Sequence, residues 1–274
     1  MTEAPDPFAP HLARWRLAPD GAPFRSLSSD LLPVRYRGRP AMLKVTDQAE
    51  ERYGAVLMAW WDGDGAARVL ARDGDALLLE RATGCRSLAA MARDGRDDEA
   101  SRTLCAVAAR LHAPRGRPRP DAIPLTVRFK ALAPAARSHG GLLVRSAEAA
   151  QVLLTASEEP VLLHGDLHHG NVLDGGERGW LAIDPKRLHG ERGFEFANIF
   201  RNPEPEVALR PGRLARQAHV VAEAADLDRA RLLRWVLAWC GLSAVWSIQD
   251  GDEAAAAATL DVGRLAAAEL GLGG

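Results

Sequence analysis

The sequence predicts an α+β protein of two lobes, in which a small antiparallel β lobe with one helix precedes a larger, mainly helical lobe. Short apolar runs bounded by turn residues fill residues 1–80, whereas helical periodicity dominates from Ser87 onward. Alanine is abundant and aromatic residues make up only 5% of the chain, a composition that favours helix. A length of 274 residues is enough for one large or two modest hydrophobic cores.

Two hairpins and one helix account for the predicted small lobe. The strands are expected at 31–36, 41–45, 67–71 and 76–80, with turns at 37–40 and 73–74. The helix is expected to begin at Asp47 and to end near Trp61, because Glu50 follows Asp47 by three residues in the pattern of a capping box. These elements predict an antiparallel sheet that carries a single helix.

The large lobe is predicted to begin after a polar, glycine-containing connector at 81–85, a candidate hinge. The domains are therefore expected at 1–82 and 83–274. Two short strands are expected around 161–163 and 180–183. The helices are expected at 99–112, 127–137, 142–156, 194–200, 212–224, 228–247 and 253–270, with Pro134 disturbing the second.

The segment L-L-H-G-D-L-H-H-G-N at 162–171 carries the strongest chemical signal. It places Asp166 five residues before Asn171, and the next apolar run leads directly to Asp184. A loop between two short strands can direct Asp166 towards an acceptor hydroxyl and Asn171 towards a metal, which Asp184 then approaches from the other side. Mg²⁺ prefers carboxylate and amide oxygens. The pattern predicts phosphoryl transfer from ATP to a hydroxyl, with Asp166 as the base and Asn171 and Asp184 as metal ligands.

A small β lobe, a hinge and a helical lobe that carries this motif together match a bilobal protein-kinase-like fold, in which the nucleotide binds in the cleft between the lobes. The segment after Asp184 is too short for a long activation loop, and D-P replaces D-F-G, so a protein kinase is not favoured.

Three histidines accompany Asp166. His164 is expected to brace the catalytic loop through backbone hydrogen bonds, and His168 is expected to lie near phosphate. A zinc site built from His164, His168 and His169 is the alternative, but no cysteine lies nearby and no H-E-x-x-H pattern occurs.

Lys44 lies within the apolar run A-M-L-K-V at 41–45. Burying a lysine without a partner is costly, so this side chain must reach solvent or a carboxylate. We expect it to contact the α- and β-phosphates and to pair with Glu51 of the following helix, with Glu50 as the second choice. A solvated strand face is the structural alternative.

Two further segments are candidate nucleotide contacts. Ser28 and Ser29 are expected to contact phosphate through hydroxyl and N–H groups, although their turn contains no glycine and could be a plain polar turn. The backbone of Glu80 and Ala82, at the expected hinge, is predicted to hydrogen-bond the base of ATP or another nucleoside triphosphate.

Composition and charge limit the binding partners and the cellular compartment expected for the protein. A net charge of −1 gives no indication of nucleic-acid or membrane-surface binding. Cys85, Cys105 and Cys240 are widely spaced and are expected to be reduced. The N-terminus lacks a signal-peptide pattern, and no apolar run is long enough to span a membrane. We expect a cytoplasmic monomer whose partner is a small-molecule acceptor.

Taken together, these residues resemble the aminoglycoside phosphotransferase superfamily, and within it the streptomycin 6-kinase branch that is grouped with hydroxyurea-type resistance kinases. The resemblance covers nearly the whole chain. Besides Ser28 and Ser29, the matching stretches are A-M-L-K at 41–44, E-E-R-Y-G at 50–54, L-H-G-D-L-H-H-G-N at 163–171, G-W-L-A-I-D-P at 179–185, G-F-E-F-A-N-I-F at 193–200 and C-G-L-S-A-V-W at 240–246.

The resemblance implies Mg²⁺-dependent transfer of the ATP γ-phosphate to a hydroxyl of streptomycin, which inactivates the drug. It assigns the base role to Asp166, the metal roles to Asn171 and Asp184, and the phosphate role to Lys44. Two departures leave the acceptor open. Lys186 and Arg187 place two cations after Asp184, where other members can carry neutral residues, and Glu195 stands where many relatives have Asp or a small residue.

Streptomycin carries two guanidinium groups, so its pocket is expected to offer carboxylates and aromatic faces. The candidate acceptor contacts in the large lobe are Glu191, Glu195, Asp250, Glu253 and Trp246, followed by Glu204, Asp252 and Trp239. The alternative is structural, because the acids at 250–253 precede a helix whose N-terminus favours them. The two tryptophans share a helix face and could belong to the core.

Two other functions fit the same residues. The first is a kinase of the same fold that acts on hydroxyurea or a metabolite. The second is a nucleotide-binding protein without catalysis, although the intact set of Lys44, Asp166, Asn171 and Asp184 argues against that alternative.

Overall fold

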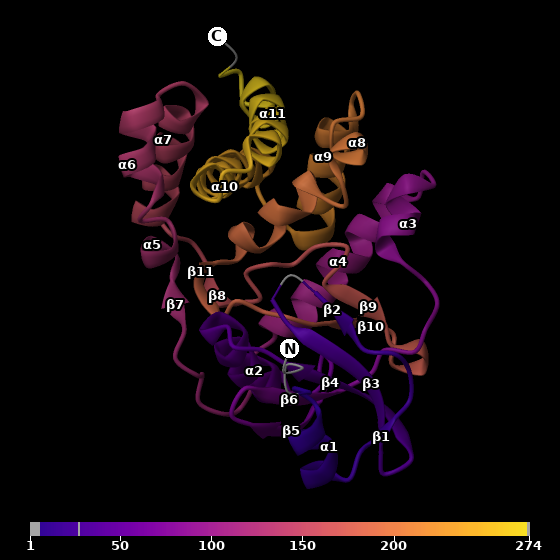
Figure 1. Cartoon of the computed structure of the whole chain (residues 1–274). Coiled ribbons are helices and arrows are strands. Elements are labelled where there is room, and N and C mark those ends of the chain that lie inside the picture. Colours follow the sequence, from indigo (N-terminus) through magenta and orange to yellow (C-terminus); the bar gives the residue numbers. More distant parts are fainter. Residues whose placement is uncertain (1–5, 27, 273–274) are drawn as a thin grey trace.

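The computed structural model describes residues 6–26 and 28–272, except for the side chains of Ala49 and Glu51. Figure 1 shows a sheet at one end of the molecule, a group of helices at the other, and short strands between them. The predicted two-lobe α+β architecture is confirmed. The boundary at 82/83 stays a prediction.

The small lobe is built on a six-stranded antiparallel sheet. Its strands are β1 (Ala18–Pro19), β2 (Phe24–Arg25), β3 (Asp30–Tyr36), β4 (Arg39–Val45), β5 (Val69–Asp73) and β6 (Ala76–Glu80). They lie in the order β1-β3-β4-β6-β5, with β2 paired to β3. The predicted hairpins are both present. The first turns at Arg37 and Gly38, whose φ values of 50° and 77° are those of a two-residue hairpin loop.

Two helices accompany this sheet, one more than expected. Helix α1 (Ala9–Trp15) is short, and the neighbouring Phe8 and Leu17 are buried with Leu32 and Val34 of β3 in a small apolar cluster. Helix α2 (Ala49–Trp61) begins two residues later than predicted. Its N-cap is Gln48, which makes no side-chain cap hydrogen bond. The predicted capping box is wrong, because the Glu50 carboxylate is paired with Arg128 instead.

The large lobe contains most of the helices. They are α3 (Leu88–Arg93), α4 (Asp97–His112), α5 (Leu125–Arg128), α6 (Leu132–His139), α7 (Leu142–Thr155), α8 (Pro205–Ala208), α9 (Arg213–Ala225), α10 (Arg229–Gln249) and α11 (Glu253–Glu269), with 3-10 segments η1 (Gly176–Arg178) and η2 (Arg192–Arg201). The helix predicted at 127–137 is divided into α5 and α6. Pro134 sits in the first turn of α6, where a missing N–H breaks no hydrogen bond.

Short strands lie between the sheet and the helices. They are β7 (Ile123–Pro124), β8 (Pro160–Leu163), β9 (Val172–Asp174), β10 (Trp180–Ala182) and β11 (Leu188–Glu191). Strand β9 pairs with β10, and β11 lies between β7 and β8. The sequence predicted β8 and β10 but not β7, β9 or β11. Proline, histidine and glycine weaken the strand pattern in β7 and β11, and β9 has only three residues.

The main hydrophobic core links α2 to the large lobe. Leu57, Met58 and Trp61 are buried in the same cluster as the residues of α4 and α10. The Trp61 indole N–H also donates to the carbonyl of Leu111 at 3.1 Å. Helix α2 is therefore fixed from the large-lobe side, although it is connected to β4 in the chain.

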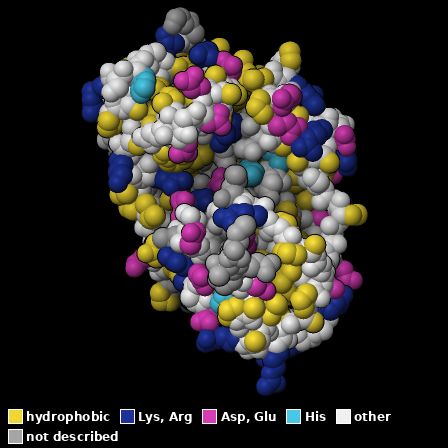
Figure 2. Space-filling model, in the orientation of Figure 1, with side chains coloured by type: hydrophobic (Ala, Val, Ile, Leu, Met, Phe, Trp, Pro, Cys, Tyr) yellow, Lys and Arg dark blue, Asp and Glu magenta, His cyan; other side chains and the backbone are white. Residues whose placement is uncertain are grey.

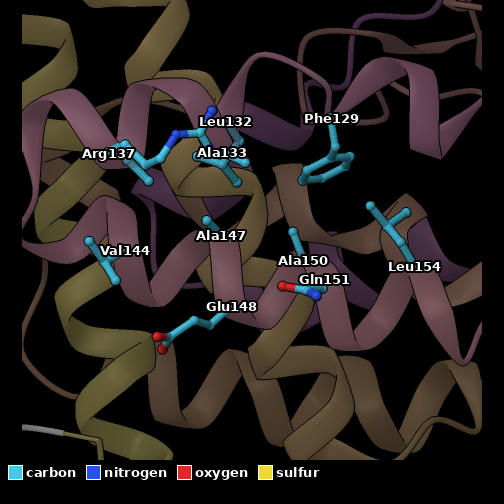
Figure 3. A pocket seen from close by; sticks show the side chains of 11 residues that line it. Phe129, Leu132, Ala133, Arg137, Val144, Ala147, Glu148, Ala150, Gln151 and Leu154 are labelled. Carbon is cyan, nitrogen blue, oxygen red and sulfur yellow. The ribbon is translucent and has the colours of Figure 1, made fainter.

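The outer face of the large lobe carries an apolar groove along α6 and α7, with a volume of about 390 Å³. Figure 3 shows Phe129, Leu132, Val144 and Leu154 around it. It shares no lining residue with the site described below. Among residues 6–26 and 28–272, no helix is long and apolar enough to cross a membrane.

The packing of α2 predicts the effect of one substitution. A Cβ at Gly54 would lie 2.2 Å from the carbonyl oxygen of Pro185, which immediately follows Asp184. Gly-to-Ala inside a helix normally stabilises by about 1 kcal/mol, but overpacking costs about 1–3 kcal/mol. Gly54→Ala is therefore expected to lower the thermal unfolding temperature. Gly116→Ala, where the Cβ meets no atom within 4 Å, is the control, and an unchanged or raised Tm in Gly54→Ala would contradict this packing.

Candidate active site

The loop between β8 and β9 positions Asp166. Its Oδ1 accepts a hydrogen bond of 2.8 Å from the Asn198 amide, and its Oδ2 accepts one of 3.2 Å from the Asn171 amide. The Asn171 amide also donates to the backbone carbonyl of Asp166 at 2.9 Å. These two amides fix the orientation of the carboxylate, as a general base requires.

The environment of Asp166 adjusts its proton affinity. Burial raises its pKa to about 6, although the positive charges of Lys186, Arg201 and Arg128 act in the opposite direction. A carboxylate with such a pKa is still ionised near neutral pH, but it accepts a proton more readily than an exposed aspartate does. Asp166 therefore has the geometry and the basicity of a general base.

His164 braces the loop as predicted. Its buried ring donates through Nε2 to the carbonyl of Ile183 at 2.7 Å and accepts the Asp166 N–H on Nδ1 at 3.2 Å. These bonds require the neutral ring with its proton on Nε2, and burial lowers the pKa of His164 below its ordinary value. The ring also stacks on Trp61, with 6.1 Å between the ring centroids. His164 therefore positions Asp166 and connects it to the strand that precedes Asp184.

The other two loop histidines have different surroundings. His168 accepts the Gly170 N–H on Nδ1 at 3.0 Å, and burial lowers its pKa to about 4. His169 is buried, with Nε2 4.0 Å from a carboxylate oxygen of Asp97. Within the part of the chain that the structure describes, no group of three His, Cys, Asp or Glu side chains could hold a metal ion.

Glu195 holds the start of the catalytic loop. Its carboxylate is buried and accepts the N–H groups of His164 and Gly165 at 2.7 and 2.8 Å, together with a hydrogen bond from His112 at 2.9 Å. Burial alone would raise the pKa of Glu195, but the hydrogen bond and charge of His112 lower it below the ordinary value. Leaving the two backbone donors unpaired would cost about 1–3 kcal/mol each.

This position corrects one prediction. Glu195 was expected to contact the acceptor, but all of its hydrogen-bonding capacity faces the interior of the protein. It belongs to the scaffold that supports Asp166.

Lys44 and Asp184 form the second half of the site. Lys44 is buried, and its Nζ lies 2.6 Å from Oδ1 of Asp184. Asp184 itself has φ of 59°, in the left-handed region. The predicted partner Glu51 has a side chain outside the described residues. The second choice, Glu50, is paired instead with Arg128 at 2.8 Å and lies 3.9 Å from Lys186.

The oxygen atoms near Asp166 fit a magnesium ion in chemical type. Because the Asn171 amide nitrogen faces Asp166, its carbonyl oxygen is left without a hydrogen bond from any described residue. Only one of the two Asp184 carboxylate oxygens is bonded, to Lys44, among the residues described. An amide and a carboxylate oxygen, with phosphate oxygens and water, are ligands that Mg²⁺ accepts.

The predicted nucleotide contacts lie in the turn before β3 and at the end of β6. Ser28 and Ser29 belong to the β2–β3 turn, and the carbonyl of Ser28 accepts from Thr46, which follows β4, at 2.7 Å. The Glu80 carboxylate accepts the Arg68 N–H and pairs with Arg178, so its side chain already has partners within the protein. Base recognition by the backbone of Glu80 and Ala82, and phosphate contact by Ser28 and Ser29, stay predictions.

Most of the side chains predicted to contact the acceptor make structural interactions within the protein instead. Glu191 is buried and accepts hydrogen bonds from Arg231 and Trp235 at 2.6–2.7 Å, which removes it from the acceptor candidates. Asp252 is the N-cap of α11 and accepts the Ala255 N–H at 2.9 Å.

The remaining candidates differ in exposure. Asp250, before α11, and Glu253, the first residue of α11, are both exposed, and Glu204 is paired with Arg93 at 2.7 Å. Trp239 is buried, whereas Trp246 is half-buried. Trp246, Asp250 and Glu253 therefore stay predicted acceptor contacts.

Asn198 was not among the site residues predicted from the sequence. It lies in η2, within the G-F-E-F-A-N-I-F stretch, and its carbonyl oxygen accepts the Trp239 indole N–H at 3.0 Å while its amide reaches Asp166. A polar residue within an apolar stretch is a signal that it needs a buried partner. The pattern could not indicate which carboxylate that partner is.

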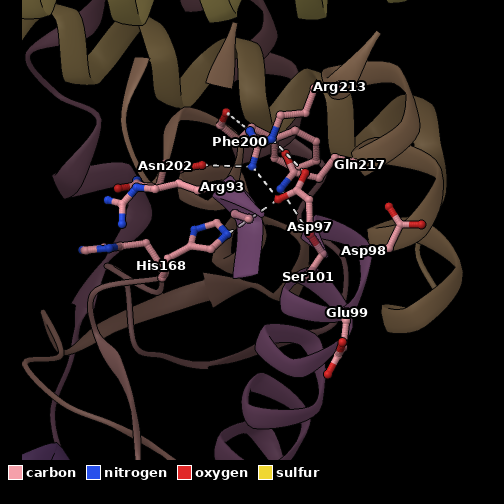
Figure 4. A network of polar contacts seen from close by, with 12 residues as sticks. Arg93, Asp97, Asp98, Glu99, Ser101, His168, Phe200, Asn202, Arg213 and Gln217 are labelled. Atoms are coloured by element: carbon pink, nitrogen blue, oxygen red, sulfur yellow. Dashed lines mark hydrogen bonds and ion pairs between the residues drawn. The ribbon is translucent and has the colours of Figure 1, made fainter. Parts of the chain in front are cut away.

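An ion pair anchors the end of η2. Arg213 of α9 makes two hydrogen bonds of 2.8 and 2.9 Å to Asp97 of α4 and donates to the carbonyls of Phe200 and Asn202 (Figure 4). Because Asn198 lies only a few residues earlier, this ion pair holds η2 against the helices behind the catalytic loop. On the surface, Figure 2 shows a hollow across the middle of the molecule, with histidine and basic side chains at its edge.

Comparisons with known proteins show the family to which the chain belongs. Residues 14–251 match the family model described as aminoglycoside/hydroxyurea antibiotic resistance kinase. The chain is 50% identical over 256 residues to streptomycin 3''-kinase of Klebsiella pneumoniae, with 92% of this chain and 96% of that protein covered. It is 33% identical over 256 residues to streptomycin 6-kinase of Streptomyces glaucescens, with 89% and 82% covered.

The fold has solved relatives. Aminoglycoside phosphotransferase APH(4)-Ia, in a ternary complex with ADP and hygromycin B, superimposes with a TM-score of 0.66 over 94% of this chain and 97% of that chain, at 16% identity. The predicted protein-kinase-like fold is thereby confirmed.

The fold is the protein-kinase-like fold of aminoglycoside phosphotransferases. The chain belongs to the aminoglycoside/hydroxyurea antibiotic resistance kinase family, as the sequence predicted.

The contacts of Asp166 predict a shift in the pH dependence of the enzyme. The Asn198 amide hydrogen bond favours the charged carboxylate, so Asn198→Ala should raise the pKa of Asp166 above about 6. Because the base must be deprotonated, the acid limb of kcat/KM should move to higher pH. Trp239→Phe removes the hydrogen bond to the Asn198 carbonyl oxygen and leaves the Asn198–Asp166 hydrogen bond in place, so it should move the limb less. An acid limb at the same pH in Asn198→Ala and the native enzyme would contradict the assignment.

Proposed function

We propose that this protein transfers the γ-phosphate of ATP to a hydroxyl of streptomycin and thereby inactivates the antibiotic. The observation that carries the proposal is the position of Asp166. Two amides hold its carboxylate, and it shares the His164 bridge with the strand that leads to the Lys44–Asp184 pair. The 50% identity to a streptomycin kinase over nearly the full length of both chains favours streptomycin as the acceptor.

The chemistry follows from the roles of these side chains. Asp166 orients the acceptor hydroxyl and takes its proton as the oxygen attacks the γ-phosphorus, and the bond from phosphorus to the leaving oxygen of ADP breaks. Lys44 contacts the α- and β-phosphates. Asn171 and Asp184 would hold Mg²⁺, which neutralises charge on the phosphates when bound. His164 and Glu195 keep the loop in place, so that the acceptor meets a base that is already oriented.

The hydroxyl that receives phosphate is a finer part of the proposal. The resemblance found in the sequence suggested the 6-hydroxyl. The higher identity to the 3''-kinase, 50% against 33% for a 6-kinase, favours the 3''-hydroxyl. Identification of the phosphorylated carbon by NMR of the purified product distinguishes the two.

An assay of acceptor-dependent ADP release distinguishes the proposed function from two alternatives. A kinase for hydroxyurea or a metabolite would give acceptor-dependent ADP release only with that compound. A protein that binds nucleotide without catalysis would release no ADP with any acceptor. The pairing of Lys44 with Asp184 and the double support of Asp166 favour catalysis over this second alternative.

The deciding measurement is coupled ADP release with ATP and Mg²⁺, with streptomycin, with a two-ring deoxystreptamine aminoglycoside, and without acceptor. Streptomycin should give the larger response. Asp166→Ala should lower kcat by about 10²-fold or more, because the positioned base is lost, while nucleotide affinity is retained. Asp121→Ala, an exposed acid, is the matched control and should behave as the native enzyme.

Other outcomes would revise the proposal. Near-native turnover of Asp166→Ala would remove Asp166 as the base. No response to streptomycin, with nucleotide binding intact, would move the acceptor to another small molecule.

A further inference from the structure

One arginine of the large lobe occupies an unusual position. The guanidinium carbon of Arg128, at the end of α5, lies 4.4 Å from the centroid of the Trp246 ring, and its NH1 lies 2.8 Å from a carboxylate oxygen of Glu50. An aromatic face on one side and a carboxylate at the edge are the two contacts by which proteins recognise a guanidinium ion.

This arrangement lies next to the catalytic base. Trp246 packs edge-to-face against Trp239, at 5.5 Å between centroids, and the Trp239 indole is bonded to Asn198, which holds Asp166. Burial is the main influence on the pKa of Asp166, but the charges of Arg128 and Glu50 also act on it. Trp246 is thus connected to Asp166 through Trp239 and Asn198, and the Arg128 and Glu50 charges lie near enough to act on the Asp166 carboxylate.

Arg128 is not fully satisfied in this place. Its Nε is buried and has no hydrogen-bond partner among the described residues. Helix α5 has only four residues, and Lys130, which soon follows it, is exposed. A buried donor without a partner is unfavourable. Moving the Arg128 side chain into solvent would satisfy this N–H, which offsets part of the free-energy cost of losing the contacts with Trp246 and Glu50.

We propose that Trp246 and Glu50 form a guanidinium-binding subsite for the acceptor, and that Arg128 occupies this subsite until an acceptor guanidinium replaces it. The proposal rests on the proposed function, since streptomycin supplies two guanidinium groups. It adds that a carboxylate from the small-lobe side and a tryptophan of α10 select the acceptor. Arg128 acts as an internal competitor.

Kinetics with streptomycin test the competition. Arg128→Ala should lower the KM for streptomycin by about threefold or more, because the subsite is then always open, and the KM for ATP should not change. In that background, Glu50→Gln should raise the streptomycin KM by about tenfold, the loss expected for one charged hydrogen bond. Arg137→Ala, which removes an exposed arginine from nearby α6, is the control and should change neither KM.

Calorimetric binding of agmatine tests the subsite without turnover. Agmatine carries one guanidinium, and 1,4-diaminobutane carries an amine in its place. Agmatine should bind Arg128→Ala more tightly than the native protein. This gain should disappear in Arg128→Ala/Glu50→Gln and in Arg128→Ala/Trp246→Leu, whereas 1,4-diaminobutane should not distinguish these proteins. Because the first double variant keeps the tryptophan packing, the test does not depend on Trp246→Leu folding.

The two proposals can fail separately. If native protein does not phosphorylate streptomycin but agmatine binds the variants in the expected order, the subsite stands and the proposed acceptor is wrong. If streptomycin is phosphorylated but its KM and agmatine binding are the same in the native protein, Arg128→Ala and the double variants, the subsite is overturned.

Discussion

The catalytic loop depends on a buried carboxylate that never meets the substrate. Glu195 accepts the two N–H groups at the start of the loop and a hydrogen bond from His112 of α4. A loop that leaves a short strand would otherwise have to bury these donors unpaired, at about 1–3 kcal/mol each. The donors belong to His164 and Gly165, the residues just before Asp166. The Glu195 carboxylate therefore also fixes the backbone that leads into the base. The Glu195 side chain thus contributes both to the stability of the fold and to the position of the base.

The sequence was most informative where a residue type is tied to a single chemical task. The motif from His164 to Asn171, the run that ends at Asp184, and Lys44 in an apolar strand each implied a partner of known type. Lys44 does pair with a carboxylate, that of Asp184, whereas the sequence had suggested Glu51, whose side chain lies outside the described residues, or Glu50. The hairpins and the long helices were predictable because their periodic apolar patterns and turn residues are local properties of the chain.

The predictions failed where a role depends on tertiary partners. Glu191 and Glu195 have the same residue type as a substrate contact, but Arg231, Trp235 and His112, far away in sequence, bury them. Asn198 looked like one polar residue in an apolar stretch until the fold placed it against Asp166. The sequence predicted one helix disturbed by Pro134 where the structure has α5 and α6. A proline is tolerated in the first turn of a helix, so its position alone does not show where one helix ends and the next begins. Composition and spacing do not record which residues become neighbours.

Helix α2 determines how the two halves of the site meet. It lies in the same core as the large lobe, it touches Pro185 so closely that only glycine fits at position 54, and its Glu50 reaches Arg128 across to α5. A small rotation of this helix would therefore change the surroundings of Asp184 and of the Trp246 face together.

The backbone at Asp184 also limits what evolution and mutagenesis can place there. With φ at 59°, the position tolerates glycine, asparagine and aspartate far better than other residues. Only aspartate among these three supplies a charged oxygen. Glutamate would keep the charge and strain the chain, and alanine would remove both the charge and the compatible conformation. Asparagine keeps the compatible conformation and removes the charge, with one carboxylate oxygen replaced by an amide NH2 group.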